Sequence, residues 1–392
     1  MIELDNRIDG NAKLRVVGVG GGGGNCISSM IAKGLQGVEF VAVNTDVQAL
    51  ERNKATARVQ IGKNLTRGLG AGADPSVGQR AAEEDSEELS RALAGSDMVF
   101  ITAGMGGGTG TGAAPIVAQV AKNLNALVVA IVTKPFASEG KRRMMQAEAG
   151  INELKKYVDT LIVIPNQKLL SVVERSTPLG EALNRANDVL YNATRGISEL
   201  ITVPGFINVD FADVRTVMKE SGDALMGAGV AIGDNRAFEA AHAAISSPLL
   251  EDVSIAGAQG VLVNITGSSS MSMSEFEEAA NVIYAAAGDE ANLILGAVVD
   301  DSAQDEMRVT VIATGFNRKT NLTPKKTTVS LFENVPSVPS NGKDKNTFEI
   351  PAFLRKSTEM QNVSVLNSNI PERPKINKND PEKPAFLRRI MD

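Results

Sequence analysis

Residues 104–112 read Gly-Met-Gly-Gly-Gly-Thr-Gly-Thr-Gly and lie between an apolar, strand-like stretch at 98–101 and a helix-like stretch that begins at Ala113. A glycine run in this position leaves backbone N–H groups free to bind an anion, and the positive end of the following helix dipole faces the same point. A P-loop would need Lys followed by Ser or Thr after the last glycine, where this chain has alanine. The run therefore predicts a phosphate-binding turn of a different type.

A second glycine run follows the segment that reads as the first strand. Gly18, Gly20 and Gly23 fit the dinucleotide-binding fingerprint, and the acidic Asp46 follows another strand-like segment. Taken alone, this pattern suggests an NAD-dependent dehydrogenase. That activity, however, offers no role for the glycine run at 104–112. Two phosphate-type turns in one domain are a more specific signal than either alone. A third glycine-rich stretch, at 68–75, is interpreted as an ordinary surface turn.

The composition indicates a folded protein whose charge is unevenly distributed. Of 392 residues, 43% are hydrophobic and 22% charged, which fits a chain with a sizeable core and two domains. The net charge is −6, yet fourteen basic and eight acidic residues follow position 316, so the preceding part is strongly acidic. An acidic body argues against nucleic-acid binding. One cysteine, no apolar run of membrane-spanning length and no signal-peptide pattern predict a cytoplasmic protein without direct membrane insertion.

Strand-like and helix-like segments alternate through the first part of the chain, which predicts an α/β fold with a parallel sheet covered on both faces. A long periodic segment from Pro178, stopped by Pro204-Gly205, predicts a central helix. Later segments predict a smaller α+β domain, and the proline-rich end is predicted to be disordered. The predicted divisions are an N-terminal tail at 1–12, a nucleotide-binding domain at 13–176, the helix at 177–203, the α+β domain at 204–316 and the tail at 317–392.

A short sequence recurs in the predicted tail. Pro-Ala-Phe-Leu-Arg is found in two candidate motifs, at 350–356 and 384–389. Apolar islands flanked by arginine in a solvated segment are typical of docking peptides that become ordered on binding. The tail is therefore predicted to carry two docking motifs.

Together these features resemble a known family. The run at 106–112 is similar to the signature loop of tubulin-like GTPases, and with Asn44-Thr45-Asp46 and the stretch 208–213 it resembles the FtsZ family of bacterial cell-division GTPases. The resemblance covers about 13–316 and the tail motifs, of which the family usually has one copy. It implies GTP hydrolysis by head-to-tail homopolymers that form the cytokinetic ring scaffold at midcell, beneath the inner membrane. It also implies membrane tethers and regulators of division that bind the tail.

The resemblance assigns a nucleotide site residue by residue. The glycine runs would position the phosphates, and the segment after the strand predicted at 126–132 would contact the ribose. Asn166, with Asn187 and Asp188 of the central helix, would contact the guanine. The candidate residues are Gly21, Gly22, Gly23, Gly24, Asn25, Gly108, Thr109, Gly110, Glu139, Arg143, Asn166, Asn187 and Asp188. For Glu139 and Arg143, the spacing is equally compatible with a solvated helix start. Leu183 stands where the family often has a phenylalanine that stacks on the base, so either GTP affinity is lower or another side chain replaces that contact.

The candidate catalytic residues are Asn208, Asp210 and Asp213. If a helix begins near Asp210, the two carboxylates project from nearly the same face, but acidic residues also cap helices, and both interpretations stay open for Asp210. For Asp213 the resemblance favours catalysis. It implies that this loop enters the GTP site of the next subunit and orients water and a Mg²⁺ shell, with no direct protein metal ligand predicted. A filament protein that binds GTP without turnover stays an alternative.

Overall fold

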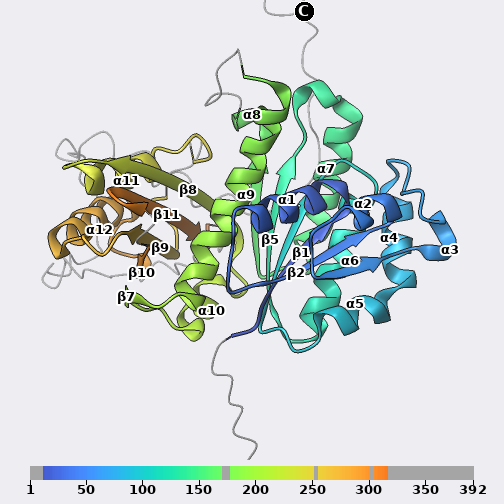
Figure 1. Cartoon of the computed structure of the whole chain (residues 1–392), viewed down its shortest axis with the longest axis horizontal. Coiled ribbons are helices and arrows are strands. Elements are labelled where there is room, and N and C mark those ends of the chain that lie inside the picture. Colours follow the sequence, from blue (N-terminus) through green and yellow to red (C-terminus); the bar gives the residue numbers. More distant parts are fainter. Residues whose placement is uncertain (1–11, 170–176, 251–254, 301–302, 317–392) are drawn as a thin grey trace, which may run out of the picture. The chain divides into compact units, whose positions relative to one another are not determined.

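The computed structural model describes residues 12–169, 177–250, 255–300 and 303–316, all within one compact unit. Across these ranges the strands form one sheet in the order β3-β2-β1-β4-β5-β6-β8-β11-β9-β10-β7 (Figure 1). The strands are β1 (Leu14–Val19), β2 (Glu39–Asn44), β3 (Ala57–Gln60), β4 (Met98–Gly104), β5 (Leu127–Lys134), β6 (Thr160–Pro165), β7 (Gly205–Ile207), β8 (Gly222–Ile232), β9 (Gly260–Gly267), β10 (Asn292–Val299) and β11 (Glu306–Thr314).

Twelve α-helices and one short 3₁₀ helix accompany the strands in the described ranges. They are α1 (Gly20–Ala32), α2 (Val47–Glu51), α3 (Lys63–Thr66), α4 (Pro75–Glu84), α5 (Ser86–Leu93), α6 (Thr109–Asn123), η1 (Ala137–Glu139), α7 (Lys141–Leu154), α8 (Asn166–Leu169), α9 (Leu179–Thr202), α10 (Phe211–Met218), α11 (Arg236–Ile245) and α12 (Met273–Ala287). None of the helices in the described part is long and apolar enough to cross a membrane.

The first six strands are all parallel, which confirms the α/β prediction. One face of their sheet packs its buried side chains against α4, α5, α6 and α7. The other face packs against α1, α2, α9 and α10. Because both faces are covered, β4 and β5 read as nearly continuous apolar runs, as buried parallel strands do.

The second half forms a mixed sheet with its own core. β11 runs antiparallel to both β8 and β9, whereas β9 and β10 are parallel. Buried residues of α11 and α12 pack with this sheet in a separate apolar cluster. β8 also pairs in parallel with the start of β6, from Thr160 to Ile162, so the sheet is continuous between the halves. The division into domains at 176, 203 and 316 stays a prediction.

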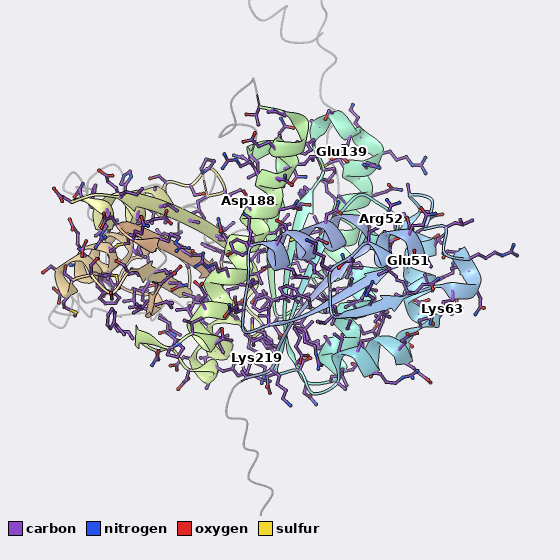
Figure 2. All side chains as sticks on the ribbon, in the orientation of Figure 1. Glu51, Arg52, Lys63, Glu139, Asp188 and Lys219 are labelled. Carbon is purple, nitrogen blue, oxygen red and sulfur yellow. The ribbon has the colours of Figure 1, made fainter. Side chains whose placement is uncertain are left out.

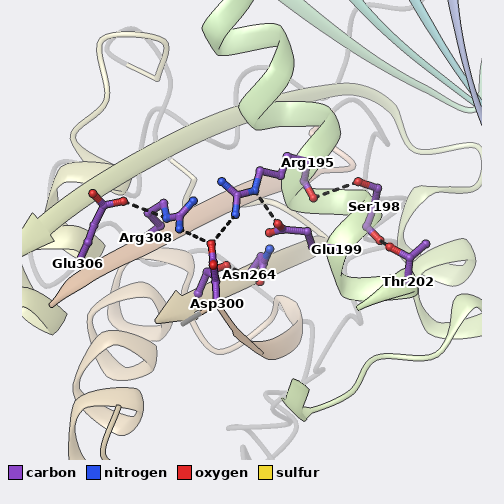
Figure 3. A network of polar contacts seen from close by, with 9 residues as sticks. Arg195, Ser198, Glu199, Thr202, Asn264, Asp300, Glu306 and Arg308 are labelled. Carbon is purple, nitrogen blue, oxygen red and sulfur yellow. Dashed lines mark hydrogen bonds and ion pairs between the residues drawn. The ribbon is translucent and has the colours of Figure 1, made fainter. Parts of the chain in front are cut away.

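A polar network ties the central helix α9 to the second half (Figure 3). Arg195 on α9 donates to the Oδ2 of Asp300 at 3.0 Å, and Arg308 on β11 donates to the same oxygen at 2.6 Å. Gly196, the next residue of α9, lies so close to β11 that a Cβ there would stand 2.8 Å from Thr310. The helix therefore rests directly on the second half of the sheet.

The structure departs from the sequence prediction at the first glycine run, where α1 begins at Gly20 and the glycines at 20–24 form its first turn instead of a loop. The second run keeps the expected turn, at 105–108, before α6 begins at Thr109. The N-terminal tail at 1–12, except Ala12, and the tail from 317 with its two docking motifs lie outside the described residues.

Candidate functional site

The two glycine-rich helix starts lie side by side at one edge of the parallel sheet. β1 and β4 are neighbours, with Val19 opposite Ala103, and α1 and α6 follow their carboxyl ends. The strand order 3-2-1-4-5-6 changes direction between these two strands. In open α/β sheets, ligands bind in the crevice at such a switch point, beyond the carboxyl ends of the strands.

The backbones of the two glycine runs touch each other. A Cβ on Gly20 would stand 2.7 Å from the backbone nitrogen of Gly110, and one on Gly22 would stand 3.1 Å from that of Gly104. Gly23 packs equally closely, because its Cβ would stand 2.4 Å from the carbonyl oxygen of Thr102. Gly20 also has φ +72°, a left-handed conformation that favours glycine. These glycines bring two helix N-termini to one point.

Other glycines of the same runs face open space. A Cβ on Gly21 or on Gly107 would meet no atom within 4 Å. Backbone N–H groups at helix starts attract anions, and the space beside these two glycines is open. The runs thus combine closely packed glycines that hold the turns together with open ones that leave room for a phosphate.

Threonines and a third segment complete the edge. Thr109 shares a 2.7 Å hydrogen bond with the hydroxyl of Thr45, and Thr111 accepts the N–H of Gly106 at 2.8 Å. The stretch at 68–75 is more than the surface turn expected from its sequence. Gly108 packs against it so closely that a Cβ would lie 2.9 Å from Ala71. Three glycine-rich segments therefore meet at this edge.

A cavity of about 200 Å³ extends from these turns between α1 and α2. Among the residues proposed for the nucleotide, Gly21, Gly24 and Asn25 line it. Asn53, which sequence reasoning missed, also lines it and donates its side-chain amide to the carbonyl of Gly24 at 2.8 Å. The cavity thus begins at the phosphate edge and is walled by amide side chains.

Asn166 provides an independent sign of a ligand site. It begins α8, directly after β6, and is 9% exposed. Its Oδ1 is buried and has no hydrogen-bond partner in the described part of the chain. A buried carbonyl oxygen without a partner destabilises a fold by about 1–3 kcal/mol, so such groups are usually explained by a ligand or water.

Glu139 and Arg143 contact each other. Arg143 donates to Glu139, and the other carboxylate oxygen accepts the backbone N–H of Phe136 at 2.9 Å. The pair therefore stabilises the start of α7 by itself, as the solvated-helix interpretation predicts. Both residues follow the carboxyl end of β5, at the same sheet edge as the glycine turns, and Figure 2 shows Glu139 at this end.

Asn187 and Asp188 lie in the first half of α9. Asp188 is engaged by Lys33, whose ammonium lies 2.7 Å from its Oδ1. Leu183, one turn before Asn187, is 46% exposed, so its side chain has room for an approaching flat ring. The structure brings these residues to the helix that packs beside α1.

The three candidate catalytic residues lie at the opposite edge of the sheet. Thr202, at the end of α9, lies against Gly37, which precedes β2, and Met218, at the end of α10, accepts a hydrogen bond from Thr160 at the start of β6. Parallel strands rise about 3.3 Å per residue, so the eight residues of β5 separate the edges by about 25 Å. Lys219, which follows α10, lies at the far end from Glu139 in Figure 2.

At that edge the acidic residues are exposed. Asp210 caps α10, since its Oδ1 accepts the N–H of Asp213 at 3.0 Å, and Asn208 accepts the N–H of Gly205 at 2.7 Å. The capping interpretation of Asp210 is thus correct, whatever else it does. The carboxylate of Asp213 has no hydrogen bond or ion pair to any described residue. Beside them Phe206 is 60% exposed.

Comparison with known proteins agrees with this geometry. Residues 13–174 match the Tubulin/FtsZ family GTPase domain, and residues 222–317 match the FtsZ family C-terminal domain. An empty FtsZ dimer from M. jannaschii is 47% identical over 78% of this chain and 89% of that chain, with a TM-score of 0.75. A GTPgS-bound protofilament of CetZ2 from Haloferax volcanii is 22% identical over 77% of this chain and 92% of that chain, with a TM-score of 0.65, and shows the fold alone.

The fold and the paired glycine turns, with these matches, define a tubulin-like GTPase. The chain belongs to the FtsZ family. Its first half is a GTP-binding and GTP-hydrolysing domain, which sets aside the dehydrogenase suggested by the first fingerprint.

Sequence reasoning missed several residues that shape this edge. Thr45 belongs to the triplet at 44–46 that carried the resemblance but was given no role in the site, and Asn53, further along the chain, was missed. Ala71 had no signal beyond the glycines around it. Lys33 is 155 positions from its partner Asp188 in the sequence, so no local pattern could connect them.

Proposed function

We propose that the protein is a GTPase that polymerises head to tail and forms the cytokinetic ring scaffold at a bacterial division site. GTP binds to the glycine turns of one subunit, with Glu139 and Arg143 near the ribose and Asn166, Asn187 and Asp188 near the guanine. The next subunit supplies Asn208, Asp210 and Asp213. Such a contact joins two different surfaces, repeats without closing, and builds a filament.

The separation of the two edges within one chain carries this proposal. About 25 Å of sheet lies between the phosphate turns and the exposed carboxylates, which is too far for one subunit to use both on one phosphate. Stacked subunits bring the edges together. Exposed apolar side chains lie at both: Leu69, 85% exposed, beside the glycine turns, and Phe206 beside the carboxylates.

The chemistry requires a positioned phosphate and an oriented water. Hydrolysis transfers the γ-phosphoryl group from GTP to water and releases GDP and phosphate, and proteins catalyse it chiefly by positioning and charge stabilisation. The open glycine N–H groups and the starts of α1 and α6 would hold the phosphate oxygens. A carboxylate such as that of Asp213, which is exposed and unpaired in the described chain, would accept a hydrogen bond from the attacking water and align it.

Mg²⁺ belongs to the proposal as an ion held mainly by the nucleotide. Within the ranges that the structure covers, no three His, Cys, Asp or Glu side chains gather as a metal site. Mg²⁺ keeps several waters and is commonly bound by substrate phosphates with one or two carboxylates. The exposed carboxylates of Asp210 and Asp213 would contact the waters of the Mg²⁺ shell rather than the ion itself. The bound ion would supply neutralising charge at the phosphates.

Activity as a function of concentration tests the shared site. We expect sedimentable polymer with GTP and much less with GDP, and a specific rate of phosphate release that rises above a threshold protein concentration. A rate per subunit that stays constant down to high dilution would contradict the shared site. Polymer that forms with GTP but releases no phosphate would instead favour the filament protein without turnover.

The cellular part of the proposal concerns the tail. We propose that the protein assembles in the cytoplasm at midcell, beneath the inner membrane, and that the motifs at 350–356 and 384–389 bind membrane tethers or regulators of division. Two weak motifs on one chain can raise avidity by about 10²–10⁴-fold when the partner presents two pockets. Phe353→Ala and Phe386→Ala should each weaken recruitment to tether-coated vesicles, and the double variant should abolish it. Equality of one single variant with the double would show that one motif acts alone.

A further inference from the structure

Lys33 connects the phosphate helix to the helix proposed to contact the base. It follows α1 directly, and its ammonium donates to the Oδ1 of Asp188 on α9 at 2.7 Å. The same ammonium lies 4.9 Å from the ring centroid of Tyr191, one turn further along α9, within the range of a cation–π interaction. Two side chains of α9 thus fix the position of this lysine.

The contact leaves half of the carboxylate available. Only Oδ1 of Asp188 is bonded to Lys33, and Oδ2 has no hydrogen-bond partner among the residues described. The two side chains are 37% and 33% exposed, so a ligand can reach them. A carboxylate oxygen can accept two hydrogen bonds, and guanine presents two adjacent donors, its N1–H and its 2-amino group.

The length of helix α1 separates the proposed phosphate contact at its start from the Lys33 contact that follows its end. Lys33 lies thirteen residues after Gly20, about 20 Å along the helix, and helical side chains lean back toward the N-terminus. A nucleoside triphosphate is elongated, with its phosphates at one end and its base at the other. If its phosphates are bound at the start of α1, its base would lie where side chains of α9 can contact it.

We propose that Lys33 is a positioning residue for base recognition: by holding Oδ1 of Asp188, it turns Oδ2 toward the N1–H and 2-amino group of guanine. This inference rests on the proposed role of Asp188 in the nucleotide site. The new element is that a lysine that does not touch the nucleotide contributes to the selectivity for guanine over other purine bases. An ion pair that merely fastens α1 to α9 would stabilise the fold without affecting that choice.

Nucleotide selectivity separates the two roles. ITP has the N1–H of GTP and lacks the 2-amino group, so the ratio of the two dissociation constants reports the contact to that group. The full-length Lys33→Met variant keeps the length of the side chain and loses the charge. We expect its affinity for GTP to fall about two- to fivefold, the range of a partly exposed ion pair, with a smaller change for ITP. Lys33→Arg should restore the ratio.

A matched pair elsewhere controls for stability. Lys155 contacts Asp223 at 2.5 Å, the two side chains being 41% and 42% exposed, and this pair also joins a helix of the first half to a separate element. Lys155→Met should lower the thermal midpoint about as much as Lys33→Met and leave the GTP-to-ITP ratio at the wild-type value. A wild-type ratio for Lys33→Met, or tighter GTP binding because Lys33 competes with the base, would overturn the inference.

Asp188→Asn distinguishes failure of this inference from failure of the site beneath it. If Asp188 reads the base, its amide variant should lose at least about tenfold of the selectivity for GTP, since a hydrogen bond to a charged group is lost. A changed ratio for Asp188→Asn with an unchanged ratio for Lys33→Met removes only the positioning role. An unchanged ratio for both removes Asp188 from the guanine site as well.

Discussion

At one edge of the parallel sheet, Gly20 and Gly110 meet backbone to backbone, whereas at the other edge Asp210 and Asp213 project into solvent from the start of α10. The first edge is complete within one chain, because its shape depends on glycines that no other residue could replace. The second has only local hydrogen bonds and exposed side chains. Under the proposed function, such a chain would bind its nucleotide alone and need a neighbour to hydrolyse it.

The largest effect that would sharpen this contrast is expected at Asp213. Asp213→Ala should bind GTP normally and lose turnover by about 10²–10⁴-fold, because it removes a positioned group and leaves the glycine turns intact. Phosphate release and nucleotide titration measure the two effects separately. Asp210→Ala is the companion variant, and it should also destabilise the fold by about 1 kcal/mol through loss of the α10 cap. Normal turnover by folded Asp213→Ala would assign the acidic edge to capping alone.

The next effect concerns the glycine edge. Gly20→Ala should destabilise the fold by at least about 2 kcal/mol and abolish GTP binding, because its Cβ meets Gly110 and its φ is left-handed. Gly21→Ala is the matched control, since its Cβ would meet nothing within 4 Å. That variant should melt like the wild type and bind GTP less well, because the methyl group occupies space proposed for phosphate. Wild-type melting and binding by Gly20→Ala would contradict the tight contact.

These two edges were not equally readable from the sequence. The glycine runs, the parallel sheet and the order of most elements followed from composition and periodicity. β8 was missed because Gly-Asp-Ala-Leu-Met-Gly-Ala-Gly reads as a loop, and only its pairing with β6 and β11 makes it a strand. The helical state of Gly20–Gly24 was missed for a related reason, since glycine disfavours a helix unless tertiary contacts demand it.

The parts of the site formed by backbone groups of a continuous glycine run could be predicted from the sequence. The parts formed by side chains far apart in the sequence were harder to predict. Asp210 was correctly expected to have a possible capping role, because that role is local in sequence. The orphaned Oδ1 of Asn166 and the contact of Lys33 with Asp188 depend on packing between α1, α8 and α9. Sequence patterns carry no record of such contacts, so they emerge only from the folded chain.

A smaller effect is expected where the base would lie. Leu183→Phe should tighten GTP binding by up to about 1–3 kcal/mol, the range of base stacking on an aromatic side chain, because the exposed position faces the same side as Asn187. Leu183→Met changes the side chain without adding an aromatic face and should leave affinity unchanged. Equal dissociation constants for all three proteins, measured by titration, would place the base elsewhere.

The smallest expected effect is a loss of stability in the second half of the chain. It tests whether an ion pair there can be removed without changing nucleotide binding at the glycine edge. Arg236 donates to Glu275 at 2.6 Å, and this contact lowers the pKa of Glu275 from 4.5 to about 2. The lowered pKa means that the pair stabilises the fold fully above pH 4.5 and progressively less as the pH falls to 2. Glu275→Gln should lose on the order of 1 kcal/mol of stability at pH 7, after discounting for solvent screening, and should lose less on acidification than the wild type.

Denaturant unfolding at pH 7 and pH 3 measures this difference. Glu88→Gln, in the exposed pair with Lys63, is the control and should change stability little at either pH. GTP affinity of Glu275→Gln at pH 7 should equal that of the wild type. A loss of affinity would show that the second half influences the glycine edge.

The narrow pairing between β6 and β8 has a consequence during synthesis on the ribosome. β6 is the last strand of the first half to emerge, and β8 begins 57 residues after Pro165. At about 5–20 residues per second, the apolar strand Thr-Leu-Ile-Val-Ile-Pro waits about 3–11 s with one hydrogen-bonding edge uncovered. Exposed strand edges recruit other strands, so this interval is when nascent chains are most open to misassembly. Slower translation between residues 165 and 222 would lengthen the exposure and increase the demand for chaperones.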